Sequence, residues 1–136
     1  MSQVKAVIDN DYWWDLGLSA KRAALWKDMQ GMYAMRDDGT SWSRGQMHWR
    51  RSDGTSLKRD GEKDLVPVMH DPGTLGCLLA LVRFVGGDDY IHVICRPDDV
   101  YIAVGGDGSE LAYSYNTEGE ALITLLVALG GLKVDD

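Results

Sequence analysis

The sequence lacks any apolar run that could cross a membrane. A spanning helix needs about 20 consecutive apolar residues, and no stretch of the 136-residue chain approaches that length. The first residues also lack the apolar segment of a signal peptide. We therefore expect a cytoplasmic protein with no membrane partner.

Cysteine and histidine are scarce, and their spacing does not indicate a metal centre. The chain has two cysteines and three histidines, with no Cys-x-x-Cys or His-x-x-x-His pair. Cys77 and Cys95 both lie in apolar periodic runs, which is typical of buried free thiols. We expect no metal site, no cofactor and no cysteine nucleophile.

Signatures of serine hydrolases and of phosphate binding are also missing. The sequence has no Gly-x-Ser-x-Gly turn. Gly105–Gly108 is rich in glycine, but a strand-like run follows it, where a phosphate cradle needs the start of a helix and usually a lysine. This segment therefore predicts a hairpin turn. A small enzyme remains an alternative, in which His70 or His92 would act beside an aspartate.

Positive charge is in short supply, because 14 Lys and Arg stand against 21 Asp and Glu and give a net charge of −7. A general nucleic-acid binder needs cations to displace phosphate counterions, so direct nucleic-acid binding is not expected. Trp42–Arg59 holds five bases and one acid, whereas Val85–Asp136 holds ten acids and two bases. Either the two segments neutralise one another in the fold, or the acidic half mimics nucleic acid toward a DNA-binding protein.

Length and composition indicate one domain, residues 1–136, with its own hydrophobic core. Apolar residues make up 45% of the chain and charged residues 26%, both ordinary values for a globular protein. Within this domain we predict an N-terminal helical part (1–39), a basic hairpin or loop (40–69) and an α-β-β-β-α core (70–136).

The strongest local pattern is the helix that begins the last part. Asp71 is a good N-cap, and Pro72 follows at the first helical position, where its missing N–H costs nothing. Gly86 and Gly87 offer the left-handed residue that closes many helices. Four apolar residues recur at helical spacing and form the predicted stripe: Leu75, Leu78, Leu79 and Val82.

Three strand-like runs and a second helix follow. The runs at 90–95, 100–104 and 111–115 are separated by turn residues and predict an antiparallel meander. Thr117 and Glu120 form a capping box that opens the last helix. Its apolar stripe is expected to face the sheet: Ala121, Leu122, Leu125, Leu126 and Leu129.

The N-terminal part is less regular. Residues 4–8 are strand-like, and whether they join a sheet stays open. Ser19 is a cap for a predicted helix from Ala20 to about Ala34, which contains good helix formers and no proline.

The middle part predicts a small hairpin within Met47–Arg59, because Asp53-Gly54 stands between two short runs. Leu65–Met69 is expected to be extended, and its proline confines it to a sheet edge or a linker. The predicted fold class is α+β, with an N-terminal helix and small β-hairpin, then a helix, a three-stranded antiparallel meander and a C-terminal helix packed on one sheet face.

Tryptophan and arginine gather in this middle part. These two residue types carry much of the binding energy of protein interfaces, so the segment is a candidate partner-binding surface. In the alternative interpretation the tryptophans cover the core and the arginines are solvated. The candidate residues are Trp42, Arg44, Trp49, Arg50 and Arg51.

Two segments resemble small uncharacterised proteins of tailed bacteriophages and prophages. Trp49–Gly54 reads Trp-Arg-Arg-Ser-Asp-Gly, and Asp71–Arg83 begins Asp-Pro-Gly-Thr-Leu-Gly-Cys-Leu. Those proteins similarly place a tryptophan-containing strand and turn before an Asp-Pro-x-Thr-x-Gly-Cys-Leu helix. A helix rich in Glu, Ala and Leu follows in them, to which Glu118–Leu129 is similar. The resemblance covers the chain from Trp49 onward and implies a phage-type origin and action inside a bacterial host.

Together these observations predict a phage-encoded, non-enzymatic accessory protein that binds a host or phage protein, with inhibition of a host defence system as one outcome. Three alternatives stay open. The chain could be an acidic nucleic-acid mimic, a virion or assembly protein that forms homo-oligomers through the tryptophan segment, or the small enzyme described above.

Overall fold

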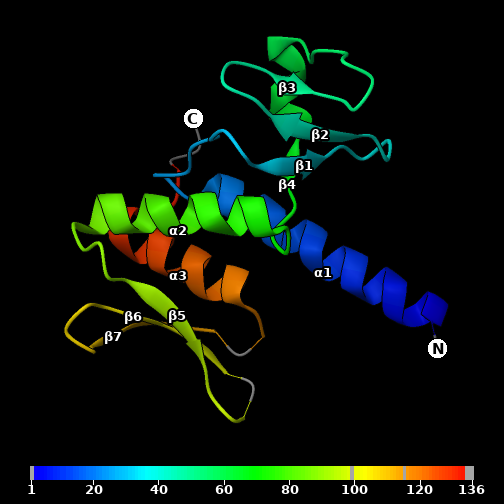
Figure 1. The fold of residues 1–136 in the computed structure, drawn as a ribbon. Coiled ribbons are helices and arrows are strands. Elements are labelled where there is room, and N and C mark those ends of the chain that lie inside the picture. Colours follow the sequence, from blue (N-terminus) through cyan, green and yellow to red (C-terminus); the bar gives the residue numbers. More distant parts are fainter. Residues whose placement is uncertain (1, 99, 115, 134–136) are drawn as a thin grey trace.

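In the computed structural model, which describes residues 2–98, 100–114 and 116–133, helices lie between two antiparallel sheets (Figure 1). This architecture confirms the predicted α+β class. None of the described helices is long and apolar enough to cross a bilayer. The helices are α1 (Ser2–Arg22), α2 (Pro72–Gly86), α3 (Glu118–Gly130) and the short 3-10 helix η1 (Arg59–Asp64).

The C-terminal helices begin and end where the sequence predicts. The Asp71 carboxylate accepts a hydrogen bond from Thr74 N at 2.9 Å and caps α2, and Gly87 ends that helix with a φ of 65°. The Thr117 hydroxyl accepts from Glu120 N at 3.2 Å and caps α3. The fully buried face of α2 is turned slightly from the predicted stripe and consists of Thr74, Leu78, Leu81 and Val82.

The predicted meander is present as a three-stranded sheet in the order β5-β6-β7. Val93, Ala103 and Ala112 lie opposite one another on its inner face, in contact with the core. Helix α3 contacts all three strands, and α2 lies on α3 (Figure 1). Tyr115, the last residue of one predicted strand, lies outside the described residues. The strands are β5 (His92–Cys95), β6 (Tyr101–Val104) and β7 (Glu110–Ser114).

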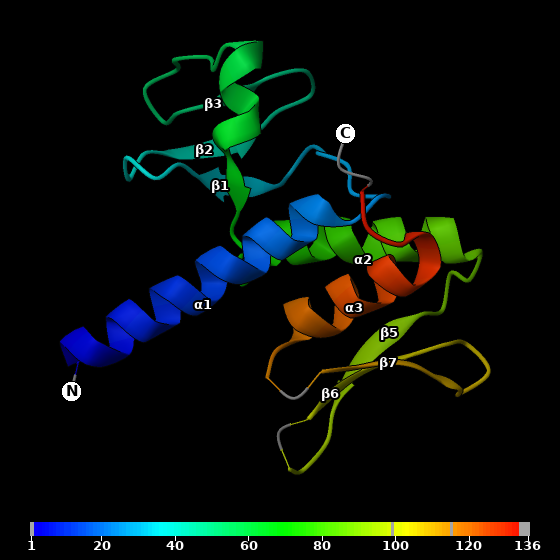
Figure 2. The same ribbon diagram turned by 180° about the vertical axis from the view of Figure 1, so that it is seen from behind.

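A second, small sheet lies on the opposite side of the helices (Figure 2). Its strand order is β3-β2-β1-β4, so the proline-containing strand is at an edge, as predicted. The expected hairpin is also present, because Arg50 pairs with Ser56 and Gly54 turns the chain with a φ of 90°. The strands are β1 (Tyr33–Met35), β2 (Ser41–Arg44), β3 (Trp49–Arg50) and β4 (Val66–Pro67).

The N-terminal part differs from the prediction. Residues 4–8, which are strand-like in sequence, belong to α1 and join neither sheet. The helix predicted from Ala20 to about Ala34 is wrong, because α1 ends at Arg22 and its supposed second half is irregular before it enters β1.

Pairing with distant segments explains where α1 ends. Ala24 N donates to Gly131 O at 2.8 Å, and Ala23 forms a bridge with Leu132. Gly31 then adopts a φ of 102°, which no helix tolerates, while its N–H donates to Arg44 O. These contacts hold the backbone groups that a continued helix would have used itself.

The core consists of two hydrophobic clusters. The larger cluster lies between the meander and the three α-helices, and it contains no residue from 30 to 68. The smaller cluster lies at the small sheet, and its buried members are Met32, Ala34, Trp42, Trp49 and Leu65. Only side chains such as Trp26 and Met29 touch both clusters.

The two thiols are less buried than the sequence predicts. Cys95 is exposed because β5 is an edge strand, with no neighbour on its outer side. Cys77 is partly buried, and its thiol lies 3.2 Å from Gln30 O. Burial raises the pKa of Cys77, so this thiol is held in its neutral form rather than as a thiolate nucleophile.

Tyr12 ties α1 to the first turn of α3. Its hydroxyl donates to Glu120 Oε2 at 2.7 Å and lies 3.0 Å from Thr117 Oγ1. The ring of Tyr12 also contacts Trp13 edge-on, at 5.1 Å between centroids. Burial, more than the nearby Glu120, raises the pKa of Tyr12 from 10.0 to about 12.

Replacing Tyr12 with phenylalanine should lower the free energy of unfolding by about 1–2 kcal/mol, because one hydrogen bond to a carboxylate is lost. The folded protein holds the Tyr12 proton more tightly than the unfolded chain does. The stability linked to this proton is therefore complete below pH 10 and is lost as the pH rises to about 12. Urea unfolding of both proteins across this window tests the linkage, and a difference between them that stays constant would contradict it.

Candidate functional site

The ladder between β2 and β3 places the predicted contact residues on two faces. Ser43 lies opposite Arg50, and Arg44 lies opposite Trp49. Side chains alternate along a strand, so Trp42, Arg44 and Trp49 share the inner face of the small sheet. Arg50 points to the other face.

The two tryptophans are buried, with 5% of Trp42 and 2% of Trp49 exposed. The expectation that they lie on an exposed hairpin is therefore wrong. The Trp42 indole donates to Thr40 Oγ1 at 3.0 Å, while the Trp49 indole N–H is buried with no acceptor among the described residues. Both rings form the centre of the smaller cluster and fix the strand that carries the arginines.

The arginines reach solvent to different degrees. Arg50 and Arg51 are exposed, and the guanidinium of Arg51 lies 5.8 Å from the Trp42 ring centroid, a cation–π distance. Arg44 is partly buried, with one terminal nitrogen donating to Gly45 O at 2.7 Å and its Nε left without an acceptor. With the exposed Lys58, a residue that sequence reasoning did not single out, these side chains form what we call the cationic surface: Arg44, Arg50, Arg51 and Lys58.

No residue of the cationic surface has an ion-pair partner in the described part of the chain, where the ion pairs are Arg36–Asp64 and Arg96–Glu110. Asp38 and Asp53 are the acids whose pKa feels Arg51. Hydrogen bonds from Thr40 to Asp38, and from Thr55 to Asp53, lower the pKa of these two carboxyls more than the arginine does. Both acids thus serve their own turns and stay ionised at the border of the surface.

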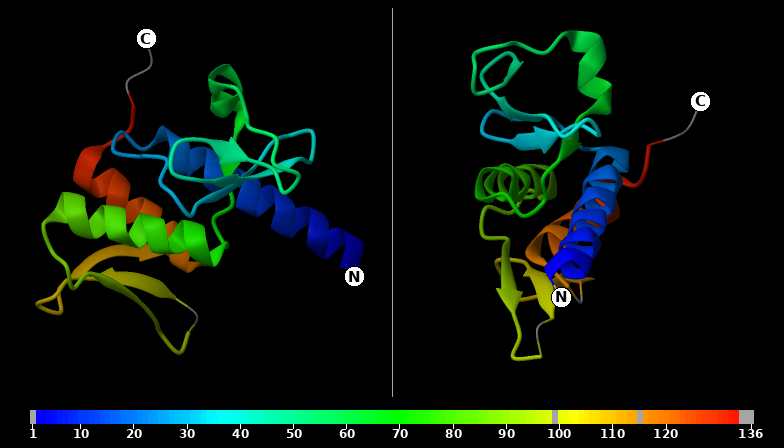
Figure 3. Two further views of the ribbon diagram at one scale, coloured as in Figure 1. Left: turned by 45° about the horizontal axis from the view of Figure 1, so that its top comes forward. Right: turned by 90° about the vertical axis from the view of Figure 1, so that its right-hand side faces the viewer.

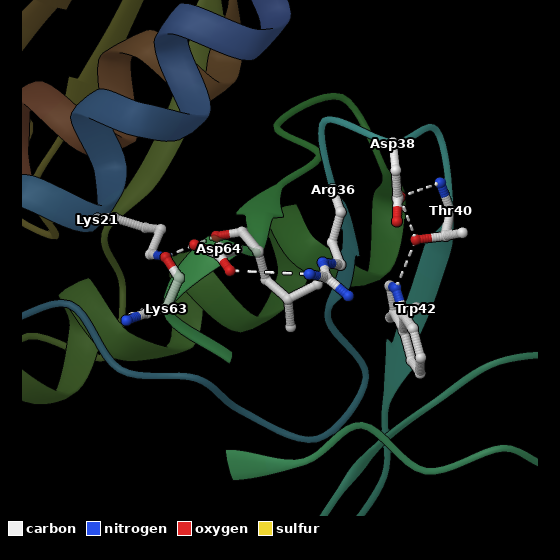
Figure 4. A network of polar contacts seen from close by, with 8 residues as sticks. Lys21, Arg36, Asp38, Thr40, Trp42, Lys63 and Asp64 are labelled. Atoms are coloured by element: carbon white, nitrogen blue, oxygen red, sulfur yellow. Dashed lines mark hydrogen bonds and ion pairs between the residues drawn. The ribbon is translucent and has the colours of Figure 1, made fainter. Parts of the chain in front are cut away.

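The small sheet is fastened to α1 by a polar network (Figure 4). Lys21 Nζ donates to Lys63 O and Leu65 O, both at 2.6 Å, and burial lowers the pKa of Lys21. Arg36 pairs with Asp64 at 3.7 Å. These contacts join α1 to both ends of the segment that follows β3, so the cationic surface stands on a fixed support.

The acidic half lies at the far end of the molecule. The meander and the small sheet flank the helices from opposite sides (Figure 3), so the basic and acidic segments do not neutralise one another. Asp88 accepts from Tyr90 N at 2.9 Å and Gly106 N at 2.8 Å, and these bonds lower its pKa. Asp107 similarly accepts from Ser109 within the predicted Gly105–Gly108 hairpin turn.

The histidines occupy separate places. His48, His70 and His92 are all exposed. The His70 ring lies 4.5 Å from that of Trp13, and His92 Nδ1 lies 3.0 Å from Tyr90 O. Among the described residues, no three His, Cys, Asp or Glu side chains lie close enough to hold a metal ion. The structure thus gathers cations at one end of the molecule and scatters its histidines.

Comparison with protein-family models, with curated proteins and with solved structures found no match to this chain. The function of the cationic surface is therefore inferred from its geometry and charge.

Proposed function

We propose that this chain is a non-enzymatic binding protein of phage type that contacts a host or phage protein through the cationic surface. One observation carries the proposal: Arg50 and Arg51 are exposed, have no ion-pair partner in the described chain, and adjoin the buried Trp49. A buried neighbour fixes the backbone beneath the arginines. Less freedom is then lost when they bind.

Charge indicates the class of partner. Guanidinium groups bind carboxylates through paired, charge-assisted hydrogen bonds, so the partner should present Asp and Glu to this surface. The acidic meander at the other end would repel the same partner and favour approach from the small sheet. The resemblance to phage proteins makes a host defence protein with an acidic surface the favoured target.

Nucleic-acid mimicry is the second candidate, and the exposed Asp89 and Asp98 beside the meander favour it. Asp88 and Asp107 contribute less, because both already bind backbone amides in turns. The two candidates differ in the end of the molecule that binds. A mimic would lose its partner when Asp89 and Asp98 are changed to lysine, and would keep it when the arginines are reversed.

The double variant Arg50→Glu/Arg51→Glu should lose the partner that the wild-type protein captures from an infected bacterial culture. With that partner purified, we expect the Kd to rise by about 100-fold or more, since an interface arginine commonly contributes 2 kcal/mol or more. Calorimetric titration measures this change. The variant should keep the wild-type unfolding midpoint, because both side chains are exposed.

A matched control reverses two exposed cations outside the cationic surface, Arg22→Glu/Lys27→Glu. This control should bind like the wild type. Equal capture of the partner by all three proteins, or equal loss in both double variants, would refute binding through the cationic surface.

A further inference from the structure

A hollow of about 450 Å³ lies between α1, the turn after β1 and the segment that leads from β4 to α2. This volume is within the range of small-molecule sites in proteins. The hollow is separate from the cationic surface, and none of its lining residues belongs to that surface. The lining residues on which the argument rests are Trp13, Trp14, Met35, Arg36, Pro67 and His70.

Flat rings form much of the wall. The indole of Trp13 and the imidazole of His70 lie 4.5 Å apart between centroids, at an angle of 47°. Trp14 and Pro67 add two more rings, and Met35 adds a thioether side chain. Trp13 and Trp14 are only half-buried, so a ligand that covers them gains burial. Aromatic walls of this kind favour a planar apolar ring, which can lie edge-on or offset against them.

Arg36 supplies the polar group of the hollow. Its Nε is buried and has no acceptor among the described residues, and its ion pair with Asp64 is long, at 3.7 Å. A buried N–H without an acceptor is costly, and a carboxylate is the acceptor that a guanidinium binds best. Asp37 also lines the hollow, but its side chain is exposed, so water screens its charge.

We propose that this hollow binds a planar aromatic carboxylate, whose ring lies against Trp13 and Trp14 and whose carboxylate accepts hydrogen bonds from Arg36. The combination of ring walls with a single under-used guanidinium carries this assignment. It does not depend on the proposed function, because the two sites share no residue.

The test compares three probes that carry the same ring system: naphthoate, its neutral amide naphthamide, and naphthylmethylamine, which is cationic at neutral pH. Isothermal titration of the wild-type protein should give a Kd of about 1 mM or lower for naphthoate, with naphthamide at least about tenfold weaker and the amine weaker still. In heteronuclear NMR spectra, naphthoate should shift the Arg36 Nε–H and the indole N–H signals of Trp13 and Trp14.

Arg36→Gln should weaken naphthoate at least about tenfold and leave naphthamide unchanged, because only the acid uses the guanidinium. Arg50→Gln is the matched control and should bind all three probes like the wild type. If Arg36→Gln does not fold, the comparison of probes on the wild-type protein still decides the matter. The proposal is overturned if naphthamide or the amine binds as tightly as naphthoate, if none of them binds, or if the NMR shifts map to other residues.

Discussion

Replacing Trp49 with alanine is expected to lower the free energy of unfolding by about 3–5 kcal/mol, the usual cost of truncating a buried aromatic side chain. Trp49 is among the largest fully buried side chains, and it lies in the smaller cluster against few other large residues. A cavity there cannot be refilled by neighbours, because Ala34 is small and Trp42 is held by its bond to Thr40. Urea unfolding, followed by circular dichroism, measures the change.

Trp49→Phe is the matched control. It keeps most of the buried ring and removes an indole N–H that has no acceptor, so its cost should stay below about 1.5 kcal/mol. This variant should also keep the partner that Arg50→Glu/Arg51→Glu loses. A loss of less than about 1 kcal/mol in Trp49→Ala would mean that the indole does not fill the cluster.

Replacing Gly17 with alanine is expected to lower the free energy of unfolding by about 2–3 kcal/mol, although alanine is the better helix former. A Cβ at this position would lie 2.5 Å from Val66 Cγ1 and inside van der Waals contact of the Pro67 carbonyl oxygen. The Pro67 oxygen is backbone and cannot move aside. α1 would therefore have to shift away from β4.

Gly76→Ala in α2 is the matched control, because a Cβ there meets no atom within 4 Å. This change should raise the free energy of unfolding by up to about 1 kcal/mol through helix propensity alone. Opposite signs for the two substitutions in the same urea titration support the close approach of α1 to β4. Stabilisation by both would show that the helix and the strand are farther apart.

Elements that depend on near neighbours could be predicted from the sequence. The Asp71 cap, the Thr117 cap and the turn at Gly54 each need only residues within a few positions, and all three are present. The end of α1 could not be predicted, because it depends on a bond between Ala24 and Gly131, more than 100 residues apart in the chain.

The candidate site divides in the same way. Exposed arginines beside a Gly turn follow from local sequence, whereas the burial of Trp42 requires β1, which pairs with it through Ala34. The prediction of a helix across that region concealed this strand. The hollow beside Arg36 was out of reach for the same reason, since its walls come from three segments that only the fold brings together.

The segment from Tyr33 to Pro67 enters and leaves the molecule at one place. Ala34 pairs with Pro67, and Val68 N donates to Tyr33 O at 2.9 Å. The larger cluster takes no residue from this segment. The segment is therefore built like an insertion into an α-helical and meander scaffold, and its surface can diversify under selection while the scaffold is conserved.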